Sequence, residues 1–303
     1  MPSTWSKRKK IADYMQKIGF IGAGKVGISL GKFFKENGFS VSGYYSRSQS
    51  SSIEGAKFTG SVQYLSIKEL VDASDIVFIT TPDNALESTA SFIASQCQGI
   101  NAKKCFVHCS GALSIKDVFK SLMEFDNFSF ASVHPMMAFS SKTQSYKELK
   151  DTFYTLESDE KAKSLILGIF EKLSVRFEII SSDVKSKYHL ASVLCSNCVV
   201  GLFDFAKDLL KECSFSDESA KAALGKLFLV NAQNIAKKGT IEALTGPVLR
   251  GDDNTVLKHL NVLSDEDKLL YMLLSRKILK VAKAKNKDFD YTKIEKIINN
   301  NFE

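Results

Sequence analysis

The sequence of 303 residues predicts an α/β fold in which a doubly wound, mainly parallel sheet is followed by an all-helical C-terminal domain. Three observations support this prediction. Strand-like and helix-like segments alternate through the first half, a glycine pattern joins the first strand to the first helix, and only helical patterns remain after about residue 182. The length allows two domains, which we expect at 15–181 and 182–303, with 1–14 as an N-terminal extension.

The first strand leads into a glycine-rich turn at residues 18–27, which read Ile-Gly-Phe-Ile-Gly-Ala-Gly-Lys-Val-Gly. Its glycines fill the pattern G-x-G-x-x-G between an apolar strand and a helix that begins near Lys25 and stops at Asn37-Gly38. The pattern predicts a Rossmann domain that binds a dinucleotide on the helix N-terminus. The expected cofactor contacts here are Gly22, Gly24, Lys25, Val26 and Gly27. A glycine turn in an unrelated α/β protein is the alternative that this context disfavours.

The end of the second strand predicts which dinucleotide is bound. An acid there would hold the ribose 2′-hydroxyl of NAD, but the sequence reads Tyr-Tyr-Ser-Arg-Ser and has no acid. Arg47 can pair with a 2′-phosphate, and Ser46 and Ser48 can donate hydrogen bonds to it. We therefore predict NADP (NADPH) as the cofactor. The alternative is a solvated loop arginine.

The other elements follow from their apolar patterns and turn signals. In the first half we expect strands at 39–45, 57–62 (weak), 75–80, 104–108 and 128–133, with helices at 66–71, 84–96 and 114–123. Two further strands at 153–157 and 175–180 flank a helix at 160–173 and extend the sheet. Helices then follow at 182–211, 217–238, 265–285 and 291–300, with loops at 213–216 and 239–253.

Several polar segments fall where parallel strands end, at residues 22–27, 80–83, 108–111 and 134–137. Ligands of doubly wound sheets bind outside the carboxyl ends of the strands. We therefore expect these segments to converge on one cleft. This adds Thr81, Pro82 and Asp83 to the cofactor contacts, and Ser110 and His134 to the catalytic candidates.

The chain has four histidines, and His189 lies on a predicted helix with three other polar residues, Ser192, Ser196 and Asn197. On one continuous helix these residues share a broad face, which would line a cavity. The alternative is a set of buried side chains satisfied by the backbone. His189 is our first candidate for a proton donor, because its ordinary pKa is near neutrality.

The run from Leu244 to Asp252 forms a second polar constellation, with Arg250 on a glycine-shaped loop where it can bind a substrate carboxylate. A structural contact between Arg250 and Asp252 is the alternative. Cys195-x-x-Cys198 invites a metal or redox interpretation, but it stands alone inside an apolar helix, where buried cysteines act as small hydrophobes. We expect no metal.

Composition narrows the class of protein. The net charge of +7 owes much to four basic residues within 1–14, and the remaining excess suits an anionic cofactor and substrate rather than nucleic acid. We find no apolar run of membrane-spanning length and no secretory signal, and six cysteines form no small disulfide framework. We expect a cytoplasmic protein without a membrane partner, whose residues 1–14 are dispensable or form a short extra helix.

These motifs together resemble one family along nearly the whole chain. It is the Rossmann-like NADP-dependent reductase family whose C-terminal helical domain was long labelled of unknown function, within the 6-phosphogluconate dehydrogenase-like superfamily that includes pyrroline-5-carboxylate reductase and ketopantoate reductase. The motifs are Gly-Ala-Gly-Lys-Val-Gly, Thr81-Pro82-Asp83, His108-Cys-Ser-Gly111, His134-Pro135, Tyr188-His189 with Ser196-Asn197, and, most specific, Leu-Thr-Gly-Pro…Arg-Gly-Asp at 244–252.

The resemblance to an alternative ketopantoate reductase branch implies reduction of 2-dehydropantoate to pantoate, for pantothenate and coenzyme A synthesis, by a homodimer joined through the helical domain. Asn197 would orient the substrate, Arg250 would bind its carboxylate in its own subunit or across the dimer, and Ser110 and His134 would complete the pocket. Alternatives are another keto acid, an imine such as pyrroline-5-carboxylate, or a non-catalytic NADP-binding sensor.

One departure concerns the Lys-x-x-x-Asn pair that β-hydroxyacid dehydrogenases of the superfamily use on the first long helix of the second domain. If Asn197 matches that asparagine, the lysine position holds Val193. The proton donor would then be another group, which is why we expect His189 to serve.

Overall fold

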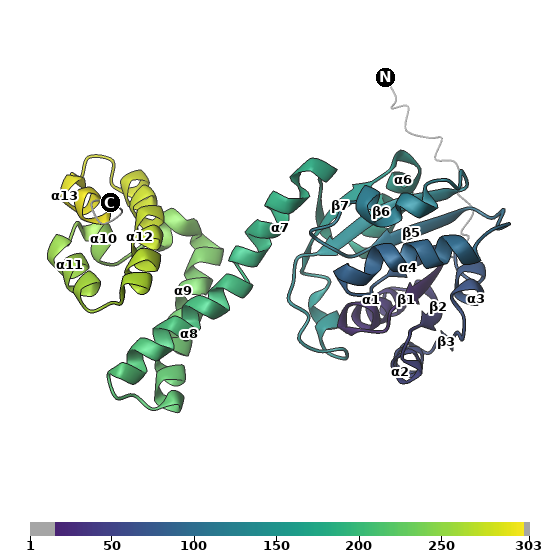
Figure 1. Ribbon diagram of the computed structural model, residues 1–303, viewed down its shortest axis with the longest axis horizontal. Helices are drawn as coiled ribbons and strands as arrows, with labels where there is room; N and C mark the ends of the chain where they lie inside the picture. The colour runs from purple at the N-terminus through teal and green to yellow at the C-terminus, as the bar shows by residue number, and fades with distance from the viewer. Residues whose placement is uncertain (1–15, 300–303) are drawn as a thin grey trace, which may run out of the picture. The chain divides into compact units, whose positions relative to one another are not determined.

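The computed structural model describes residues 16–299, and contacts divide the chain into two compact units, Met1–Val199 and Val200–Glu303 (Figure 1). The division predicted from the sequence lies at 181/182, where the sheet ends. The helical turn and the helix that follow stay with the first unit. The expected extension at 1–14 lies outside the described residues.

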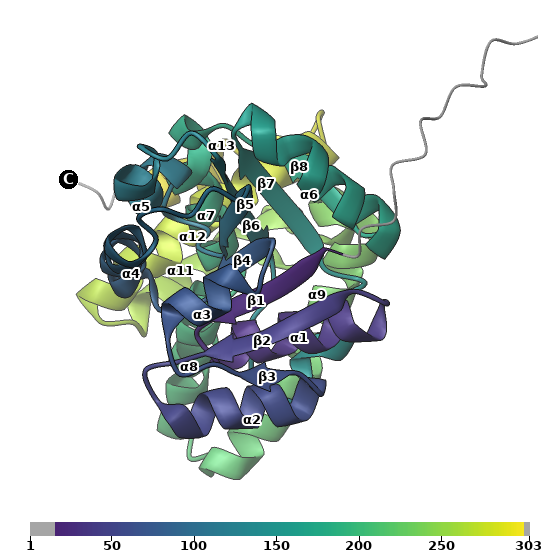
Figure 2. The ribbon, with the colours of Figure 1, turned by 90° about the vertical axis from the view of Figure 1, so that its right-hand side faces the viewer.

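The first unit is built on an eight-stranded sheet with the order β3-β2-β1-β4-β5-β6-β7-β8 (Figure 2). Neighbouring strands are parallel except for β6 and β7, which are antiparallel. The predicted doubly wound, mainly parallel sheet is therefore confirmed. The strands are β1 (Lys17–Ile21), β2 (Ser40–Tyr45), β3 (Val62–Gln63), β4 (Ile76–Ile79), β5 (Lys104–His108), β6 (Phe128–Pro135), β7 (Phe153–Ser158) and β8 (Arg176–Ile179).

Helices cover both faces of this sheet, because successive strand residues point to opposite sides and both sides are apolar. Phe20 and Phe78 pack into one core with α1 and α6, whereas Ile79 and its neighbours pack into another with α3, α4 and α5. The helices of the first unit are α1 (Lys25–Glu36), α2 (Gln49–Thr59), α3 (Ile67–Asp72), α4 (Asp83–Gln96), α5 (Ile115–Phe119), α6 (Glu160–Leu173) and α7 (Lys185–Leu194), with short 3₁₀ turns at Lys120–Leu122, Ser145–Glu148 and Ser182–Val184.

The weak strand predicted at 57–62 is wrong over its first half, since residues 57–59 belong to helix α2 and the strand β3 begins only at Val62. The buried residues of α2 follow the helical spacing i, i+3, i+4, i+7, but they are small: Ser52, Gly55, Ala56 and Thr59. A Cβ on Gly55 would contact the ring of Tyr44, so the helix needs a small residue there to approach the sheet. Small buried residues hide the helical pattern from a search for apolar periodicity.

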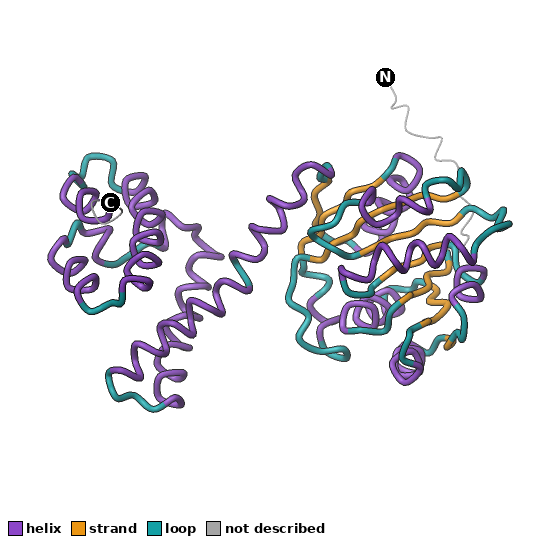
Figure 3. The backbone as a smooth tube through the Cα atoms, in the orientation of Figure 1, coloured by secondary structure: helices purple, strands orange, loops and turns teal. Residues whose placement is uncertain are grey.

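The second unit is helical, as Figure 3 shows by the colour of its trace, and the predicted all-helical C-terminal region is confirmed. Its own core contains Val256, Leu260, Met272, Leu279 and Ile294. The helices from the end of the first unit onward are α8 (Asn197–Glu212), α9 (Asp217–Ala243), α10 (Pro247–Arg250), α11 (Asp253–Asn261), α12 (Asp265–Lys285) and α13 (Thr292–Asn299).

Three helical predictions need correction. The single helix expected at 182–211 is interrupted at Cys195 and Ser196, between α7 and α8. The helix expected at 217–238 continues to Ala243, across a break at Gly239, where φ is 78°. The loop expected at 239–253 contains α10, whose first residue Pro247 suits a helix start.

The expectation that no apolar run is long enough to span a membrane is wrong when length and composition alone are considered. Among the described residues, the helical stretch Ser182–Glu212 is long and apolar enough to cross a membrane, with a mean hydropathy of 1.4 over its most apolar segment. Lys185 near its start is nevertheless buried and ion-paired with Glu157 of the sheet. The beginning of this stretch is therefore anchored to the first unit by a polar contact.

Candidate functional site

The turn between β1 and α1 has the backbone geometry that a dinucleotide pyrophosphate requires. Gly22 has a φ of 104°, which favours glycine. A Cβ on Gly27 would collide with the carbonyl oxygen of Gly22 and with the hydroxyl of Thr80, so this glycine lets helix and strand pack closely. A Cβ on Gly24 would meet nothing within 4 Å, because Gly24 faces open space before the first turn of α1.

Two adjoining clefts lie along the carboxyl edge of the sheet. The larger, of about 860 Å³, is lined by Gly22, Ser46, Arg47, Ser48 and residues near them. The smaller, of about 410 Å³, is lined by Lys25, Val26, Asp83, Ser110 and others. Both share Gly24, Thr80, Thr81 and Pro82. Every cofactor contact expected from the sequence lines one of the clefts except Gly27, which packs beneath the turn.

The hydroxyl of Ser110 is held at the smaller cleft by a dense set of hydrogen bonds. It donates to Asp83 Oδ2 at 2.7 Å and accepts from the backbone amides of Ala112 and Leu113 at 3.2 and 3.1 Å. The Ser110 amide donates to Nδ1 of His108 at 3.2 Å. Ser110 therefore joins the end of β5 to the start of α4 and has a fixed orientation.

A row of buried polar residues crosses three neighbouring strands below the cleft. His108 of β5 pairs in register with Ser132 of β6, and Ser132 lies opposite Glu157 of β7. Residues opposite each other on paired strands point to the same face. The antiparallel placement of β7 thus brings a buried carboxylate next to the residues at the ends of β5 and β6.

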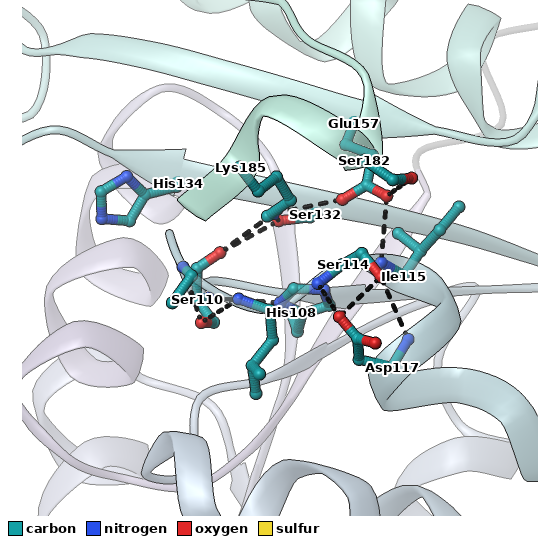
Figure 4. Close-up of polar contacts among 12 residues, drawn as sticks. His108, Ser110, Ser114, Ile115, Asp117, Ser132, His134, Glu157, Ser182 and Lys185 are labelled. Carbon is teal, nitrogen blue, oxygen red and sulfur yellow. Dashed lines mark hydrogen bonds and ion pairs between the residues drawn. The ribbon is translucent and has the colours of Figure 1, made fainter. Parts of the chain in front are cut away.

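Lys185, near the start of α7, reaches into this row (Figure 4). Its ammonium lies 3.2 Å from Glu157 Oε2 and donates to Ser132 Oγ at 2.6 Å and to the Ser110 carbonyl oxygen at 3.2 Å. The two charged side chains are only 3% and 4% exposed. Burial lowers the pKa of Lys185, and Glu157 opposes that shift.

The other carboxylate oxygen of Glu157 completes the cluster. Oε1 accepts from Ser182 Oγ at 2.6 Å and from the Ile115 amide at 3.1 Å. Lys185 and Glu157 are not among the residues predicted from the sequence. A local signal for the lysine existed, because Lys185 and His189 have the four-residue spacing of the Lys-x-x-x-Asn pair, with histidine in place of asparagine.

One turn after Lys185, helix α7 presents Tyr188 and His189 to the end of β6. The Tyr188 hydroxyl lies 2.6 Å from Nδ1 of His134, and the rings of His134 and His189 are 6.4 Å apart. A Cβ on Gly111 would lie 2.9 Å from atoms of both histidines, so the glycine makes room for them. The end of β6 and helix α7 thus bring together His134 and His189, which the sequence predicts as site residues, and Tyr188 is an additional partner.

The protonation of this group follows from burial. Burial, helped by the charges of Lys185 and His189, lowers the pKa of His134 to about 4. Burial and the nearby Lys185 lower the pKa of His108 to about 3, and burial raises the pKa of the Tyr188 phenol. At neutral pH His134 is therefore an uncharged imidazole and Tyr188 a neutral phenol, with one hydrogen bond between them.

The remaining catalytic candidates lie elsewhere. Asn197 is exposed at the start of α8, where its Oδ1 accepts from Ser196 Oγ at 3.1 Å. The turn at Cys195 and Ser196 lies between His189 and Asn197, so the single continuous helix on which the sequence places both residues is interrupted. Cys195 and Cys198 are exposed rather than buried, so their interpretation as buried hydrophobes is also wrong.

Arg250 ends α10 in the second unit, immediately before Gly251 in the left-handed conformation. The Asp252 carboxylate caps α11 by accepting from the amide and the hydroxyl of Thr255 at 3.0 and 2.7 Å. These hydrogen bonds lower the pKa of Asp252, and the charge of Arg250 adds a smaller contribution in the same direction. The loop is held further by Tyr291, whose hydroxyl donates to the Leu249 carbonyl at 2.7 Å. Helix capping is therefore the stronger interaction of Asp252, and the suggested interaction with Arg250 is a weaker electrostatic one.

Two family models match consecutive parts of the chain: a Rossmann-like domain over residues 2–135 and a domain of unknown function, DUF2520, over residues 152–278. The chain combines a Rossmann-like domain with a DUF2520 domain. The family resemblance given by the motifs is confirmed at this level. No curated protein matches the chain significantly.

Solved structures with the same fold include a provisionally named NADP oxidoreductase from Bacteroides fragilis, which is 24% identical, with a TM-score of 0.68 and coverage of 88% of this chain and 98% of that one. A Thermotoga maritima protein is 25% identical, with a TM-score of 0.67 and the same coverage. A pyrroline-5-carboxylate reductase from Coxiella burnetii is 14% identical, with a TM-score of 0.60 and coverage of 90% and 98%.

Proposed function

We propose that the protein is an NADPH-dependent reductase that converts 2-dehydropantoate to pantoate. The observation that carries the proposal is the pair of clefts along the sheet edge, whose smaller member is bordered by Ser110 at the strand ends. The pyrroline-5-carboxylate reductase of Plasmodium falciparum, which has this fold at 16% identity, was solved with NADP bound. An imine reductase from Pseudomonas also has this fold.

The residues present fit NADPH. Gly24 leaves open space for the pyrophosphate at the N-terminus of α1. Arg47, Ser46 and Ser48 would hold the 2′-phosphate in the larger cleft, where none of the lining residues that the structure describes is acidic. Thr81, Pro82 and Asp83 would border the nicotinamide in the smaller cleft. Bound there, NADPH would supply the hydride for carbonyl reduction.

The chain itself would provide the proton and the orientation. An alkoxide that forms on the substrate needs a hydrogen-bond donor and a proton. His189 is our candidate for this role, since it lies beside His134 across Gly111. Neutral His134, hydrogen-bonded to Tyr188, would fix the polar wall next to it. Ser110 would hold Asp83 in place at the cleft rather than donate a proton itself.

Arg250 of the second unit and Asn197 at the start of α8 would contribute the rest of the site. We assign Arg250 to the substrate carboxylate and Asn197 to orienting the substrate, in one subunit or across a homodimer. The support for a dimer is that the described α8 has no buried residue and α9 has only Ala220, although both helices are rich in leucine, valine and phenylalanine. Sedimentation velocity that gives a monomer at micromolar concentration would refute the dimer. The six free cysteines suit the cytoplasm.

The function is tested by NADPH consumption with 2-dehydropantoate, beside pyrroline-5-carboxylate, acetolactate and 2-oxoisovalerate. We expect efficient turnover of 2-dehydropantoate alone. Turnover of pyrroline-5-carboxylate instead would establish an imine reductase, an alternative that the fold shared with imine and pyrroline carboxylate reductases supports. NADPH binding without any turnover would support a sensor. His189→Ala with near-full turnover and an unchanged pH profile would refute the proton-donor assignment.

A further inference from the structure

The connection between β6 and β7 forms part of the wall of both clefts. Phe139 lines the smaller cleft and Lys142 lines the larger one. The connection is tied to α1, because the hydroxyl of Ser29 lies 3.5 and 3.4 Å from the carbonyl oxygens of Ser141 and Lys142. A segment that follows the Rossmann strands by sequence thus extends beside the first helix of the dinucleotide turn.

The backbone next to Lys142 is fixed by local hydrogen bonds. The Ser141 amide donates to Ser145 Oγ at 3.1 Å, and the Thr143 amide donates to Ser141 Oγ at 3.2 Å. Ser145 then begins a 3₁₀ turn and is buried. Lys142 therefore extends from an ordered turn. Its ammonium loses less conformational entropy on binding a ligand than the ammonium of a lysine on a flexible loop would lose.

The Lys142 side chain is positioned by one acidic partner. Its ammonium lies 2.6 Å from Glu54 Oε2 of α2, and the two side chains are 33% and 44% exposed. An ammonium has three N–H donors, so the bond to Glu54 leaves donors for a second acceptor. Glu54 itself does not line the cleft, whereas Lys142 does.

The charged side chains that line the larger cleft in the described part of the chain have one sign. Among the described residues that line it, Arg47 and Lys142 are the charged ones, and both are cationic. Arg47 follows β2 and Lys142 comes from a segment 95 residues later, so two separate parts of the first unit each bring a cation to one cavity. Ser48 and Ser51, at the beginning of α2, line the same cavity.

We propose that Lys142 is a second cation for the 2′-phosphate of NADPH, delivered by the β6–β7 connection and held ready by Glu54. This inference rests on the cofactor of the proposed function and not on its substrate. Arg47 would bind the phosphate from the end of β2, and Lys142 would bind it from the β6–β7 connection. Charge-assisted hydrogen bonds to phosphate are stronger than neutral ones, so the second cation raises selectivity for NADPH over NADH.

The test measures binding rather than turnover. Isothermal titration of adenosine 2′,5′-bisphosphate and of adenosine 5′-monophosphate is carried out on the full chain, since these two probes differ by the 2′-phosphate alone. For Lys142→Met we expect about tenfold weaker binding of the bisphosphate, the loss of one charge-assisted contact, with unchanged binding of the monophosphate. Lys142→Arg should recover most of the loss, and the selectivity should decrease with added salt.

Lys147→Met is the matched control, because Lys147 is an exposed lysine of the same connection and does not line the cleft. It should leave both affinities unchanged. Equal weakening of both probes by Lys142→Met, or wild-type affinity for the bisphosphate, would overturn the inference. A wild-type protein that binds both probes equally would refute NADP itself and this inference with it. Failure to reduce 2-dehydropantoate would leave the inference standing.

Discussion

Replacing Lys185 with methionine tests whether the buried ion pair anchors α7. Methionine keeps most of the side-chain volume but removes the ammonium, which leaves Glu157 as a buried carboxylate without its cation. Removal of one partner from a buried pair costs about 3–5 kcal/mol of unfolding free energy. We expect a loss within this range, because both side chains are almost fully buried and the hydrogen bonds to Ser132 and Ser110 are lost as well.

The double variant Lys185→Met with Glu157→Gln separates the uncompensated charge from the lost contacts. A glutamine at 157 is neutral, and its oxygen can still accept from Ser182 and the Ile115 amide. We expect the double variant to be more stable than Lys185→Met alone, with a coupling energy of about 1–3 kcal/mol. Lys187→Met, a change of an exposed lysine on the same helix, should stay within about 0.5 kcal/mol of wild type.

Hydrogen–deuterium exchange mass spectrometry against urea concentration, read on peptides from β6 and β7, reports the unfolding of the first unit separately from the second. A Lys185→Met variant within about 1 kcal/mol of wild type would refute the reasoning. So would a double variant that costs the sum of the single variants, since independent effects would mean that the two charges do not interact.

Further measurements test the glycine turn, the buried histidines and Tyr188. Gly24→Val should fold normally but lose NADPH binding in titration calorimetry, because the valine side chain would enter the cleft. Gly27→Ala, in contrast, should lower the unfolding free energy by about 1–3 kcal/mol, because the added methyl group overpacks the contact with Gly22 and Thr80. Because the pKa values of His108 and His134 are low in the folded protein, only the unfolded chain takes up protons at these histidines just below pH 6.5. The unfolding free energy should therefore fall by about 2 kcal/mol per histidine between pH 7 and 5. In denaturant unfolding, His134→Asn should lose about 2 kcal/mol less than wild type over the same pH range. Tyr188→Phe should lower kcat by about tenfold or more while the NADPH affinity is unchanged, and an unaltered kcat would contradict a role for its bond to His134.

Elements with local signals could be predicted closely from the sequence. The helices expected at 160–173 and 265–285 match α6 and α12, whose starts are capped by Asp159 and Ser264. Helix α2 was missed because its buried side is made of small residues, and the division of 182–211 into α7 and α8 was missed because the apolar pattern continues through Cys195. Periodicity reports which face is apolar, but it does not report where a helix breaks.

The candidate site shows the same limit. The glycine turn and the segments at the strand ends could be predicted, since their geometry is local or follows from parallel strands. The pairing of Glu157 with Lys185 depends on the antiparallel register that sets Glu157 opposite Ser132, and no local pattern encodes that register. Lys142 reaches the cleft through a connection whose path the sequence does not reveal.

The bonds at Ser110 have a consequence for design. Lys185 and Ser132 both donate to the main-chain carbonyl oxygen of Ser110, not to its side chain. Every amino acid at position 110 would offer the same acceptor, so the attachment of α7 does not depend on which side chain borders the cleft. A saturation library at this position therefore varies the shape and polarity of the cleft wall while the helix that carries Tyr188 and His189 keeps its anchor.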